Sequence, residues 1–330
     1  MTTYKSSGVD IAAGDEAVNR IKPLVRSTFT PGVISDIGLF GGLFDGRFPE
    51  YEHPVLVASA DGVGTKLKVA FMTGKHNTVG HDLVNHCTND ILACGAEPLF
   101  FLDYFASGKL EPAIVEQVVA GLSAGCRENG CALLGGETAE MPSMYAEGEY
   151  DIAGTIVGVV DKSKILRPEN VEVGDILIGL PSSGLHTNGY SLARAALFPR
   201  YSPDFYLENS GKTLGEALLA VHRSYLSLFR PLLRDNLVAA LSHITGGGIV
   251  GNTKRVLQAG KSLEIFWNAW EIPQIFQFIQ QAGEIPEQDM REAFNLGIGI
   301  IIVAKEKNVQ EITMRLADEN PVIVGRIVEA

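Results

Sequence analysis

Residues 59–66 (SADGVGTK) place an acid, two glycines and a base in one turn that follows an apolar stretch. The carboxylate of Asp61 is suited to a hard cation such as Mg²⁺. Gly62 and Gly64 allow a ligand to approach the backbone closely, and Lys66 offers a point charge to a phosphate. The P-loop pattern is absent, so this segment resembles a phosphate loop only in its physical properties.

A second glycine-rich stretch, residues 135–141 (GGETAEM), supplies two further acids, Glu137 and Glu140. We expect a short strand over 132–135 to run into a turn at Gly136, which would present Glu137 to a ligand. Mg²⁺ takes one or two carboxylates together with phosphate oxygens and water, so acids from separate turns are sufficient. Taken alone, such a glutamate is more often a helix-start residue near the helix dipole.

The pattern of residues 81–95 predicts a helix that ends at a glycine suited to a C-cap. Its polar residues are spaced i, i+4, i+7 and i+8, so Asp82, His86, Asn89 and Asp90 lie along one stripe. A solvated helix face is the simplest interpretation of an isolated stripe. The two carboxylate-bearing turns in the same half of the chain favour a binding site instead, with Asp90 as a metal ligand.

Two other features of the first half leave alternatives open. Asp103 lies in an otherwise apolar strand, so its carboxylate must be paired, and the partner is structural or functional. Residues 38–45 (GLFGGLFD) form either a flexible cover over a nucleotide or a turn that packs closely.

Two polar loops stand out in the second half. Residues 182–191 (SSGLHTNGYS) place hydroxyls, an amide and His186 before an expected helix, which suits a phosphate or a sugar. A lone loop histidine is usually a surface residue, but this setting makes His186 a candidate general base or substrate ligand. Residues 242–248 (SHITGGG) are similar, and their match to a dinucleotide fingerprint is weak because no clear strand and helix alternation surrounds it. The candidate substrate ligands are Ser182, Ser183, His186, Asn188, His243, Thr245, Gly246 and Gly247.

Composition narrows the possible functions. The chain has 330 residues, 46% hydrophobic and 20% charged, and no apolar run reaches the ~18 residues of a membrane helix. Its net charge of -12 argues against a nucleic-acid surface, which needs clustered Lys and Arg. No signal-peptide pattern is present at the start, so we expect a cytoplasmic protein. The four cysteines lack metal-site spacing and are expected to be reduced core residues.

The order of apolar segments predicts two mixed α/β domains. We expect residues 1–165 to form an N-terminal domain and 166–330 a C-terminal domain, because the polar stretch 161–174 separates them. Strands are predicted over 55–60, 99–106, 132–135, 152–160, 176–180, 298–303 and 322–328. Helices are predicted over 81–95, 111–130, 191–197, 214–233 and 272–282, and after 307.

Several segments together resemble one family, the phosphoribosylformylglycinamidine cyclo-ligases, or aminoimidazole ribonucleotide synthetases, of purine biosynthesis. Residues 90–98 carry the spacing Asp-x4-Gly-Ala-x-Pro, which is similar to the signature of an ATP-binding superfamily. The chain departs from the family pattern at Ser6-Ser7, Thr88 and Ser143, and the first of these leaves Lys5 as the one charged candidate near the N-terminus. The matching segments span nearly the whole chain and are 4–14, 60–66, 89–110, 130–141, 182–191, 243–248 and 294–299.

The resemblance implies a fold, a reaction and a set of ligands. The expected fold is α/β (α+β), with an N-terminal ATP-binding domain whose sheet forms a barrel across a homodimer, and a C-terminal α/β domain. The expected reaction is ATP-dependent cyclisation of formylglycinamidine ribonucleotide to 5-aminoimidazole ribonucleotide, with release of ADP and phosphate. ATP and Mg²⁺ are implied, K⁺ or another monovalent cation is compatible, and neither nucleic acid nor a membrane is expected as a partner. The resemblance implies that the metal ligands are Asp61, Asp90 and Glu137. The implied catalytic residues are His186, Lys66 and Asp90. The implied ATP contacts are Asp61, Gly62, Gly64, Lys66, Asp82, Asn89, Gly136 and Glu137.

Other members of the superfamily fit less well. A selenophosphate synthetase should carry a reactive Cys or selenocysteine near its N-terminus, and residues 6–45 contain no Cys. The hydrogenase maturation factor should end in a Cys, whereas this chain ends in VGRIVEA. Thiamine-phosphate kinase is the nearest enzyme alternative, and the match over 99–110 argues against it. A nucleotide-binding regulator without turnover is the alternative from another class.

Overall fold

The computed structural model describes residues 7–208 and 210–330. Lys5, which belongs to the N-terminal segment of the family match, lies outside the described residues. The chain divides into two compact units, the first made of residues up to 91 with 97–159, and the second of 92–96 with 160–330.

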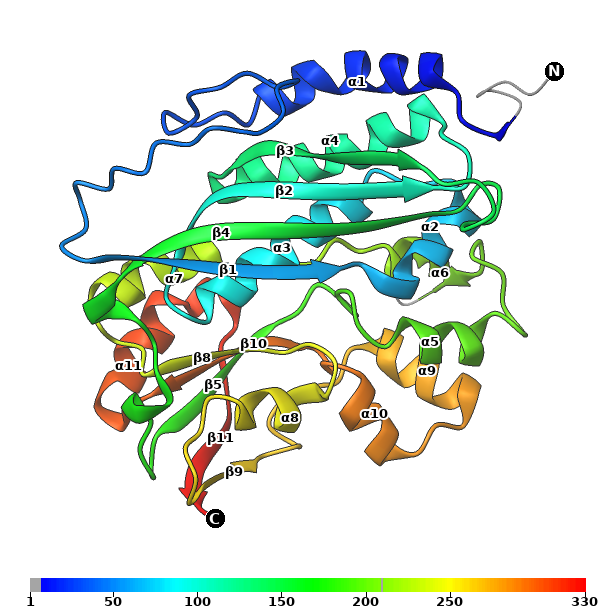
Figure 1. Ribbon diagram of the computed structural model, residues 1–330. Helices are drawn as coiled ribbons and strands as arrows, with labels where there is room; N and C mark the ends of the chain where they lie inside the picture. The colour runs from blue at the N-terminus through cyan, green and yellow to red at the C-terminus, as the bar shows by residue number, and fades with distance from the viewer. Residues whose placement is uncertain (1–6, 209) are drawn as a thin grey trace. The chain divides into compact units, whose positions relative to one another are not determined.

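The first unit is built on a four-stranded sheet of β1 (Pro54–Gly62), β4 (Tyr150–Asp161), β2 (Glu97–Ser107) and β3 (Ala132–Glu140), in that order (Figure 1). β2 pairs with β3 in parallel and with β4 in antiparallel orientation. β1 and β3 are therefore the two edge strands, with β4 and β2 between them.

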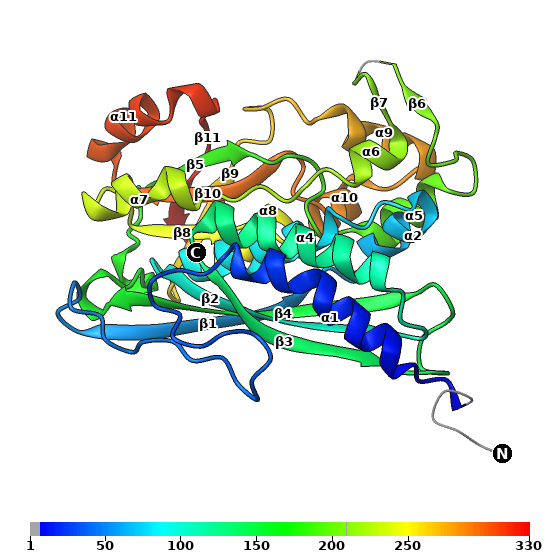
Figure 2. The ribbon, with the colours of Figure 1, turned by 90° about the horizontal axis from the view of Figure 1, so that it is seen from above.

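The long helices of the first unit are α1 (Ile11–Arg26), α3 (Val79–Leu92) and α4 (Pro112–Asn129). α1 lies beside α4 (Figure 2). α3 and α4 pack backbone against backbone, because a Cβ added to Gly80 would lie 2.2 Å from the carbonyl oxygen of Val118. Pro112 starts α4, and Gly130, with a φ of 70°, ends it.

The two faces of β2 differ in exposure. Phe101 and Phe105 are buried, whereas Leu102 and Tyr104, which alternate with them, are 37% and 36% exposed. Leu56 of the edge strand β1 is 61% exposed. The sheet of the single chain thus buries one face and presents apolar side chains on the other.

The second unit contains a five-stranded antiparallel sheet of β8 (Ala240–His243), β10 (Ile298–Ala304), β5 (Ile176–Pro181), β11 (Val322–Glu329) and β9 (Lys261–Ile265), in that order. β10 is buried at every position. Ile300 and Ile302 belong to one core cluster, and Ile301 and Val303 belong to another. Both faces of the sheet are covered, which explains why β10 is a continuous apolar run rather than an alternating one.

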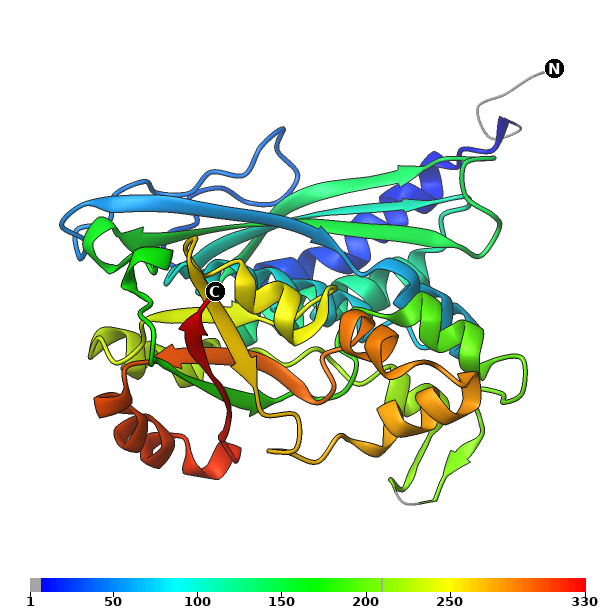
Figure 3. The ribbon, with the colours of Figure 1, turned by 90° about the horizontal axis from the view of Figure 1, so that it is seen from below.

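Helices of the second unit surround this sheet. α9 (Gln274–Gly283), drawn in orange, lies beside α5 (Tyr190–Leu197), drawn in green (Figure 3). The others are α6 (Leu214–Leu218), α7 (Leu226–Arg234), α8 (Gly248–Lys254), α10 (Glu287–Ala293) and α11 (Glu306–Arg315). β6 (Tyr206–Leu207) and β7 (Lys212–Thr213) form a small separate hairpin.

Two predicted elements differ in the structure. The expected helix over 214–233 is two helices, α6 and α7, because the segment between them turns inward and buries His222 and Tyr225 completely. The expected turn after residue 135 is part of β3, because pairing with β2 continues as far as Glu140. In both places long-range contacts outweigh the local pattern. The elements that were not predicted are the helices α1, α2 (Leu67–Thr73), α8 and α10 and the strands β6, β7, β8 and β9.

No helix within the described residues has the length and apolar character needed to cross a membrane. The four cysteines are free thiols, as predicted, and Cys87, Cys126 and Cys131 are buried whereas Cys94 is partly exposed.

Candidate active site

Asp61 and Asp90 come together around the imidazole of His86. β1 carries Asp61 near its C-terminal end, and α3 carries His86 and Asp90 one turn apart. His86 Nε2 lies 2.7 Å from Asp61 Oδ2 and 3.9 Å from Asp90 Oδ2. Ser59 Oγ donates a hydrogen bond of 2.9 Å to Asp90 Oδ2. The structure thus brings two of the three predicted metal ligands together and adds Ser59 and His86 to them.

We call Asp61, His86 and Asp90 the acidic site, and its electrostatics follow from its partial burial. Burial disfavours the ionised carboxylate, but the hydrogen bond and charge of His86 outweigh burial and hold the pKa of Asp61 below its ordinary value. Burial also disfavours the imidazolium, but Asp61 and Asp90 outweigh it and raise the pKa of His86. The acidic site therefore favours a positive charge between its two carboxylates.

Glu137 lies away from the acidic site. It belongs to β3, the edge strand opposite β1, which carries Asp61. Three strand spacings of about 4.8 Å place opposite edges about 14 Å apart. One ion cannot bind both carboxylates at that separation, because metal to oxygen distances are about 2 Å. The three-carboxylate cluster is therefore not formed within the single chain, since the segment with Glu137 is a strand of the sheet and not a turn.

Lys66 and Asp82 form a buried ion pair. Lys66 ends the short 3₁₀ helix η2 (Gly64–Lys66), which leads into α2 (Leu67–Thr73), and Asp82 lies in the first turn of α3. The Nζ to Oδ1 distance is 2.8 Å, and both side chains are 0% exposed. Burial lowers the pKa of Lys66, and Asp82 opposes this shift. The predicted phosphate contact of Lys66 requires an accessible ammonium group, which this arrangement does not provide.

The remaining predicted ATP contacts lie on the same elements. The Gly62 N–H donates a hydrogen bond of 2.7 Å to Asp61 Oδ1, which orients that carboxylate, and Gly64 adopts a left-handed φ of 62°. Asn89 is completely buried on α3. A Cβ at Gly136 would lie 2.2 Å from Asp103 Oδ1, so Gly136 leaves space for the Asp103 carboxylate.

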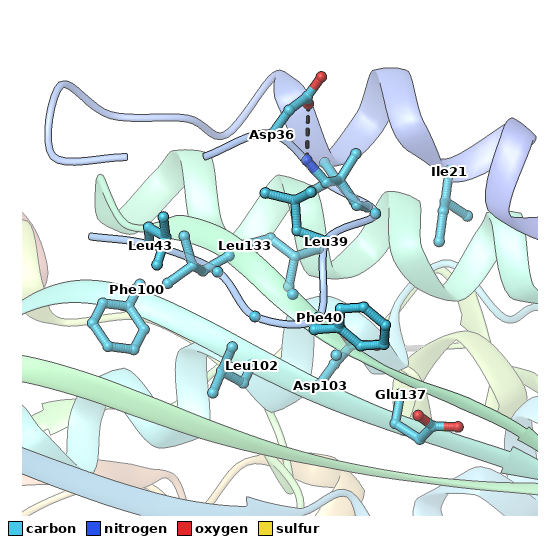
Figure 4. A pocket seen from close by; sticks show the side chains of 18 of the residues that line it. Ile21, Asp36, Leu39, Phe40, Leu43, Phe100, Leu102, Asp103, Leu133 and Glu137 are labelled. Atoms are coloured by element: carbon cyan, nitrogen blue, oxygen red, sulfur yellow. Dashed lines mark hydrogen bonds between the residues drawn. The ribbon is translucent and has the colours of Figure 1, made fainter. Parts of the chain in front are cut away.

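A cavity of about 1020 Å³ lies between α1, the glycine-rich segment 38–45, β2 and β3 (Figure 4). Its lining is largely apolar and includes Ile21, Phe100 and Leu133. The segment 38–45 both lines the cavity and packs closely, because a Cβ at Gly42 would lie 2.4 Å from Leu134 Cγ. The cavity could not be found from the sequence, since α1 and β3 are about a hundred residues apart along the chain.

Asp103 connects this cavity to the acidic site. Together with Leu102 it lines the large cavity and also a smaller hollow of about 340 Å³, which is bounded by Asp61 and Thr155. Burial raises the pKa of Asp103 to about 7. The two hollows thus share Leu102 and Asp103, with the glycine-rich segment lining the larger one and Asp61 lining the smaller one.

The two predicted substrate loops of the second unit lie side by side. A Cβ at Gly246 would press against Asn188 Oδ1, at 3.3 Å. The Asn252 amide donates to the carbonyl oxygens of Thr245, Gly246 and Gly248 and so fixes the glycine turn. Gly246 and Gly247 are exposed. The turn therefore presents accessible backbone groups of the kind that bind phosphate.

The remaining loop residues differ in accessibility. Ser183 is exposed, whereas Ser182 is half-buried and donates to the carbonyl oxygen of Gly184. His186, predicted as a loop residue open to substrate, is 0% exposed and accepts a hydrogen bond of 3.2 Å from the Ser183 N–H at Nε2. The loop therefore exposes Ser183 at the surface, whereas the side chain of His186 points into the interior.

Two family models together match most of the chain. Residues 49–160 match the family described as AIR synthase related protein, N-terminal domain, and residues 172–330 match the corresponding C-terminal domain. Among solved structures, thiamine-monophosphate kinase from Stenotrophomonas maltophilia is similar with a TM-score of 0.68 at 17% identity, covering 96% of this chain and 94% of that chain. Hydrogenase maturation protein HypE in complex with ATP gives a TM-score of 0.66 at 16% identity, covering 94% of this chain and 86% of that chain. The fold is thus the mixed two-domain fold of AIR synthase related proteins.

Curated relatives narrow this class to one family. The phosphoribosylformylglycinamidine cyclo-ligase of Trichlorobacter lovleyi is 51% identical over 319 residues, covering 95% of this chain and 90% of the relative. The enzyme of the same name from Citrifermentans bemidjiense is 50% identical over 329 residues, covering 98% of this chain and 94% of the relative. The chain belongs to the phosphoribosylformylglycinamidine cyclo-ligase family.

Proposed function

We propose that the chain is an ATP-dependent cyclo-ligase of purine biosynthesis, which closes formylglycinamidine ribonucleotide to 5-aminoimidazole ribonucleotide. The observation that carries this proposal is identity of 50% and more to cyclo-ligases over nearly the full length of both chains. In the reaction ATP transfers its γ-phosphoryl group to the formamide oxygen, and an amidine nitrogen then attacks the same carbon. The C–N bond forms as the C–O bond to phosphate breaks, and ADP, phosphate and a proton are released.

The first unit is proposed to hold Mg²⁺ and the ATP phosphates at the acidic site. The residues fit a hard cation, because two carboxylates converge there, at 2.7 Å and 3.9 Å from His86 Nε2. When bound, Mg²⁺ would offset the negative charge that develops on the transferring phosphate. Asp61 and Asp90 would hold the ion, while Ser59 and the Gly62 N–H orient the two carboxylates. A requirement for a monovalent cation such as K⁺ is a further proposal from the family resemblance.

The cavity is proposed to hold the adenosine part of ATP. Its apolar lining suits a purine ring, and Glu137 at its rim can accept hydrogen bonds from ribose hydroxyls. Asp103 lines both this cavity and the smaller hollow that Asp61 bounds, so an extended nucleotide could reach both places. In this arrangement Glu137 contacts the nucleoside end, and the metal is held by Asp61 and Asp90.

The second unit is proposed to hold the ribonucleotide substrate. The exposed backbone of Gly246 and Gly247 suits its phosphate, and Ser183 and Asn188 suit its sugar hydroxyls. Proton transfer in ring closure is proposed for the histidines behind these loops, His186 and His243. A His186→Ala variant that keeps full turnover would exclude His186 from that role.

A homodimer and a cytoplasmic location are also proposed. The sheet face with Leu56, Leu102 and Tyr104 is an apolar surface suited to pairing with a second copy. Sedimentation equilibrium should give about twice the monomer mass of 35.5 kDa, and a monomer at micromolar concentration would contradict the dimer. The cytoplasm is proposed because the substrates of a purine-biosynthetic ligase, including ATP, are cytoplasmic metabolites.

One assay tests the function directly. ADP release is measured with formylglycinamidine ribonucleotide, with thiamine phosphate and without a second substrate. We expect ADP release only with the first, together with an equal amount of the imidazole product. ADP release that is independent of formylglycinamidine ribonucleotide would overturn the proposal. Nucleotide binding with no ADP release in any reaction would favour a regulator.

A further inference from the structure

Three histidines from separate segments of the second unit meet in its interior. His186 lies in the loop between β5 and α5, His222 in the segment between α6 and α7, and His243 at the end of β8. Their exposed fractions are 0%, 0% and 6%. One ring nitrogen from each can be chosen so that all three nitrogens lie within 4.8 Å of one another. Of the three, His222 alone was not a candidate site residue in the sequence analysis, because no polar loop motif surrounds it.

Two of these rings already point their nitrogens at one another. His222 Nε2 lies 3.1 Å from His243 Nε2. Two nitrogens at this distance share one proton, so one ring donates and the other presents a lone pair. Ligands of a tetrahedral ion at 2.0–2.1 Å are about 3.4 Å apart. A metal ion could therefore replace the shared proton with a small movement of the two rings.

The third ring requires a rotation. The rings of His186 and His222 are stacked, with centroids 3.9 Å apart and planes inclined by 21°. His186 Nε2 accepts a hydrogen bond from the Ser183 N–H, so its lone pair is already on the nitrogen that a metal would use. Rotation about the Cβ–Cγ bond would exchange that hydrogen bond for a metal bond. Gly299 leaves space at this place, because a Cβ there would lie 2.6 Å from His186 Cε1.

Neighbouring groups orient the rings in the way that metal-binding histidines require. Thr187 Oγ1 lies 3.4 Å from His222 Nδ1, and so supports the ring nitrogen that faces away from His243. Imidazole nitrogen is a ligand that suits Zn²⁺, Co²⁺, Ni²⁺ or Cu²⁺ better than it suits Mg²⁺. We infer that His186, His222 and His243 form a site for a divalent transition-metal ion.

The test uses the purified full chain after removal of metals by a chelator. Co²⁺ is added in the presence of excess Mg²⁺, so that oxygen ligands at the acidic site are occupied, and visible d–d absorption reports bound Co²⁺. We expect one Co²⁺ per chain with a tetrahedral spectrum that Zn²⁺ abolishes. His222→Gln should weaken Co²⁺ binding by at least about tenfold. Loss of a group that only supports a ligand already weakens metal binding by about that factor, and loss of the ligand itself should weaken it at least as much. His53→Gln, which changes an exposed histidine of the first unit, is the matched control and should bind as the parent does.

A second measurement does not depend on any variant being folded. X-ray absorption of the Zn²⁺-loaded parent protein should show scattering from three imidazoles. Affinity that is equal in His222→Gln and the parent, or a spectrum with oxygen ligands alone, would overturn the proposal. Absence of Co²⁺ and Zn²⁺ binding at millimolar concentration would do the same. A bound ion would occupy His186 and His243, so this site competes with their proposed role in proton transfer and leaves the rest of the proposed function unchanged. None of these measurements uses cyclo-ligase activity, so the metal site and the cyclo-ligase reaction can fail separately.

Discussion

The segment from the end of β1 through η2, together with the helix α3, forms two charged groups of opposite character. Lys66 and Asp82 are 0% exposed and neutralise each other at 2.8 Å. Asp61 and Asp90 are 42% and 29% exposed, and their carboxylate oxygens lie 2.7 Å and 3.9 Å from Nε2 of the weakly basic His86. A buried pair is satisfied within the protein, whereas a half-exposed excess of carboxylate remains available for a cation from solution. Burial therefore distinguishes Asp82, which belongs to a structural ion pair, from Asp90, which belongs to a candidate binding site, although both lie in the same polar stripe of α3.

The largest expected effect on stability comes from breaking the buried pair. Lys66→Ala leaves the Asp82 carboxylate buried without its cation, so the free energy of unfolding should fall by about 3–5 kcal/mol. Urea denaturation monitored by circular dichroism measures this loss. The matched control, Lys66→Met with Asp82→Leu, removes both charges and should recover most of the stability. Equal losses in the single and double variants would show that packing, not charge, is responsible.

The acidic site should behave in the opposite way. Asp90→Asn is expected to lower turnover by about 10²–10³-fold, because the variant loses a charge that holds the metal and phosphates. Its free energy of unfolding should stay within about 1 kcal/mol of the parent value, since the site is partly solvated. ADP release and urea denaturation measure the two quantities on one preparation. A variant as unstable as Lys66→Ala would remove the distinction between the two groups.

Asp103 provides a pH test between these extremes. Its pKa of about 7 in the folded chain exceeds the ~3.9 of an unfolded aspartate, so the folded chain binds more protons between these values. Its stabilising contribution is present below about pH 4 and is lost as the pH rises through about 7. Asp103→Asn mimics the protonated acid and should therefore be more stable than the parent at pH 8, by about 1–2 kcal/mol after allowance for partial exposure. At pH 4 the difference should vanish. A constant difference at both pH values in urea denaturation would contradict the shifted pKa.

The smallest expected effect concerns Ser59. Its hydroxyl donates to Asp90 Oδ2 at 2.9 Å, so Ser59→Ala removes one hydrogen bond and leaves both carboxylates in place. The loss should be about 0.5–1.5 kcal/mol, which appears as an about 2- to 13-fold rise in the Mg²⁺ concentration for half-maximal activity. Ser59→Thr, which keeps the hydroxyl, is the control. No change in Ser59→Ala would mean that solvent orients Asp90 equally well.

Local pattern was a sound guide to much of the fold. Hydrophobic runs marked β2, β4, β10 and β11, and the end of α4 at Gly130 follows from its left-handed conformation. α1 was not predicted, because it buries only a narrow strip of side chains against the rest of the first unit. The predicted domain boundary at 165/166 lies within the polar stretch 161–174, close to the division after 159 that the structure makes.

For the polar stripe on α3, the sequence predicted the helix face but not the burial or the partners of its side chains. The spacing of Asp82, His86, Asn89 and Asp90 correctly placed them on one side of a helix, but their burial ranges from complete to partial. His86 belonged to the same stripe and could have been assigned with Asp90, as its neighbour one turn away. Nothing in the sequence indicates that Lys66 turns inward to pair with Asp82.

The sequence by itself determined the family of this protein, the kinds of residue available for its chemistry and most of its regular elements, because these depend on residue type and short-range spacing. Tertiary structure decided which charges meet. It paired Lys66 with Asp82, joined Asp61 to Asp90 through His86, and put Glu137 on the opposite edge of the sheet. It also gathered three histidines whose positions along the chain give no sign of contact. The reason is physical: strand order and burial are set by contacts between distant segments, and those contacts fix both the distance between charges and their solvation.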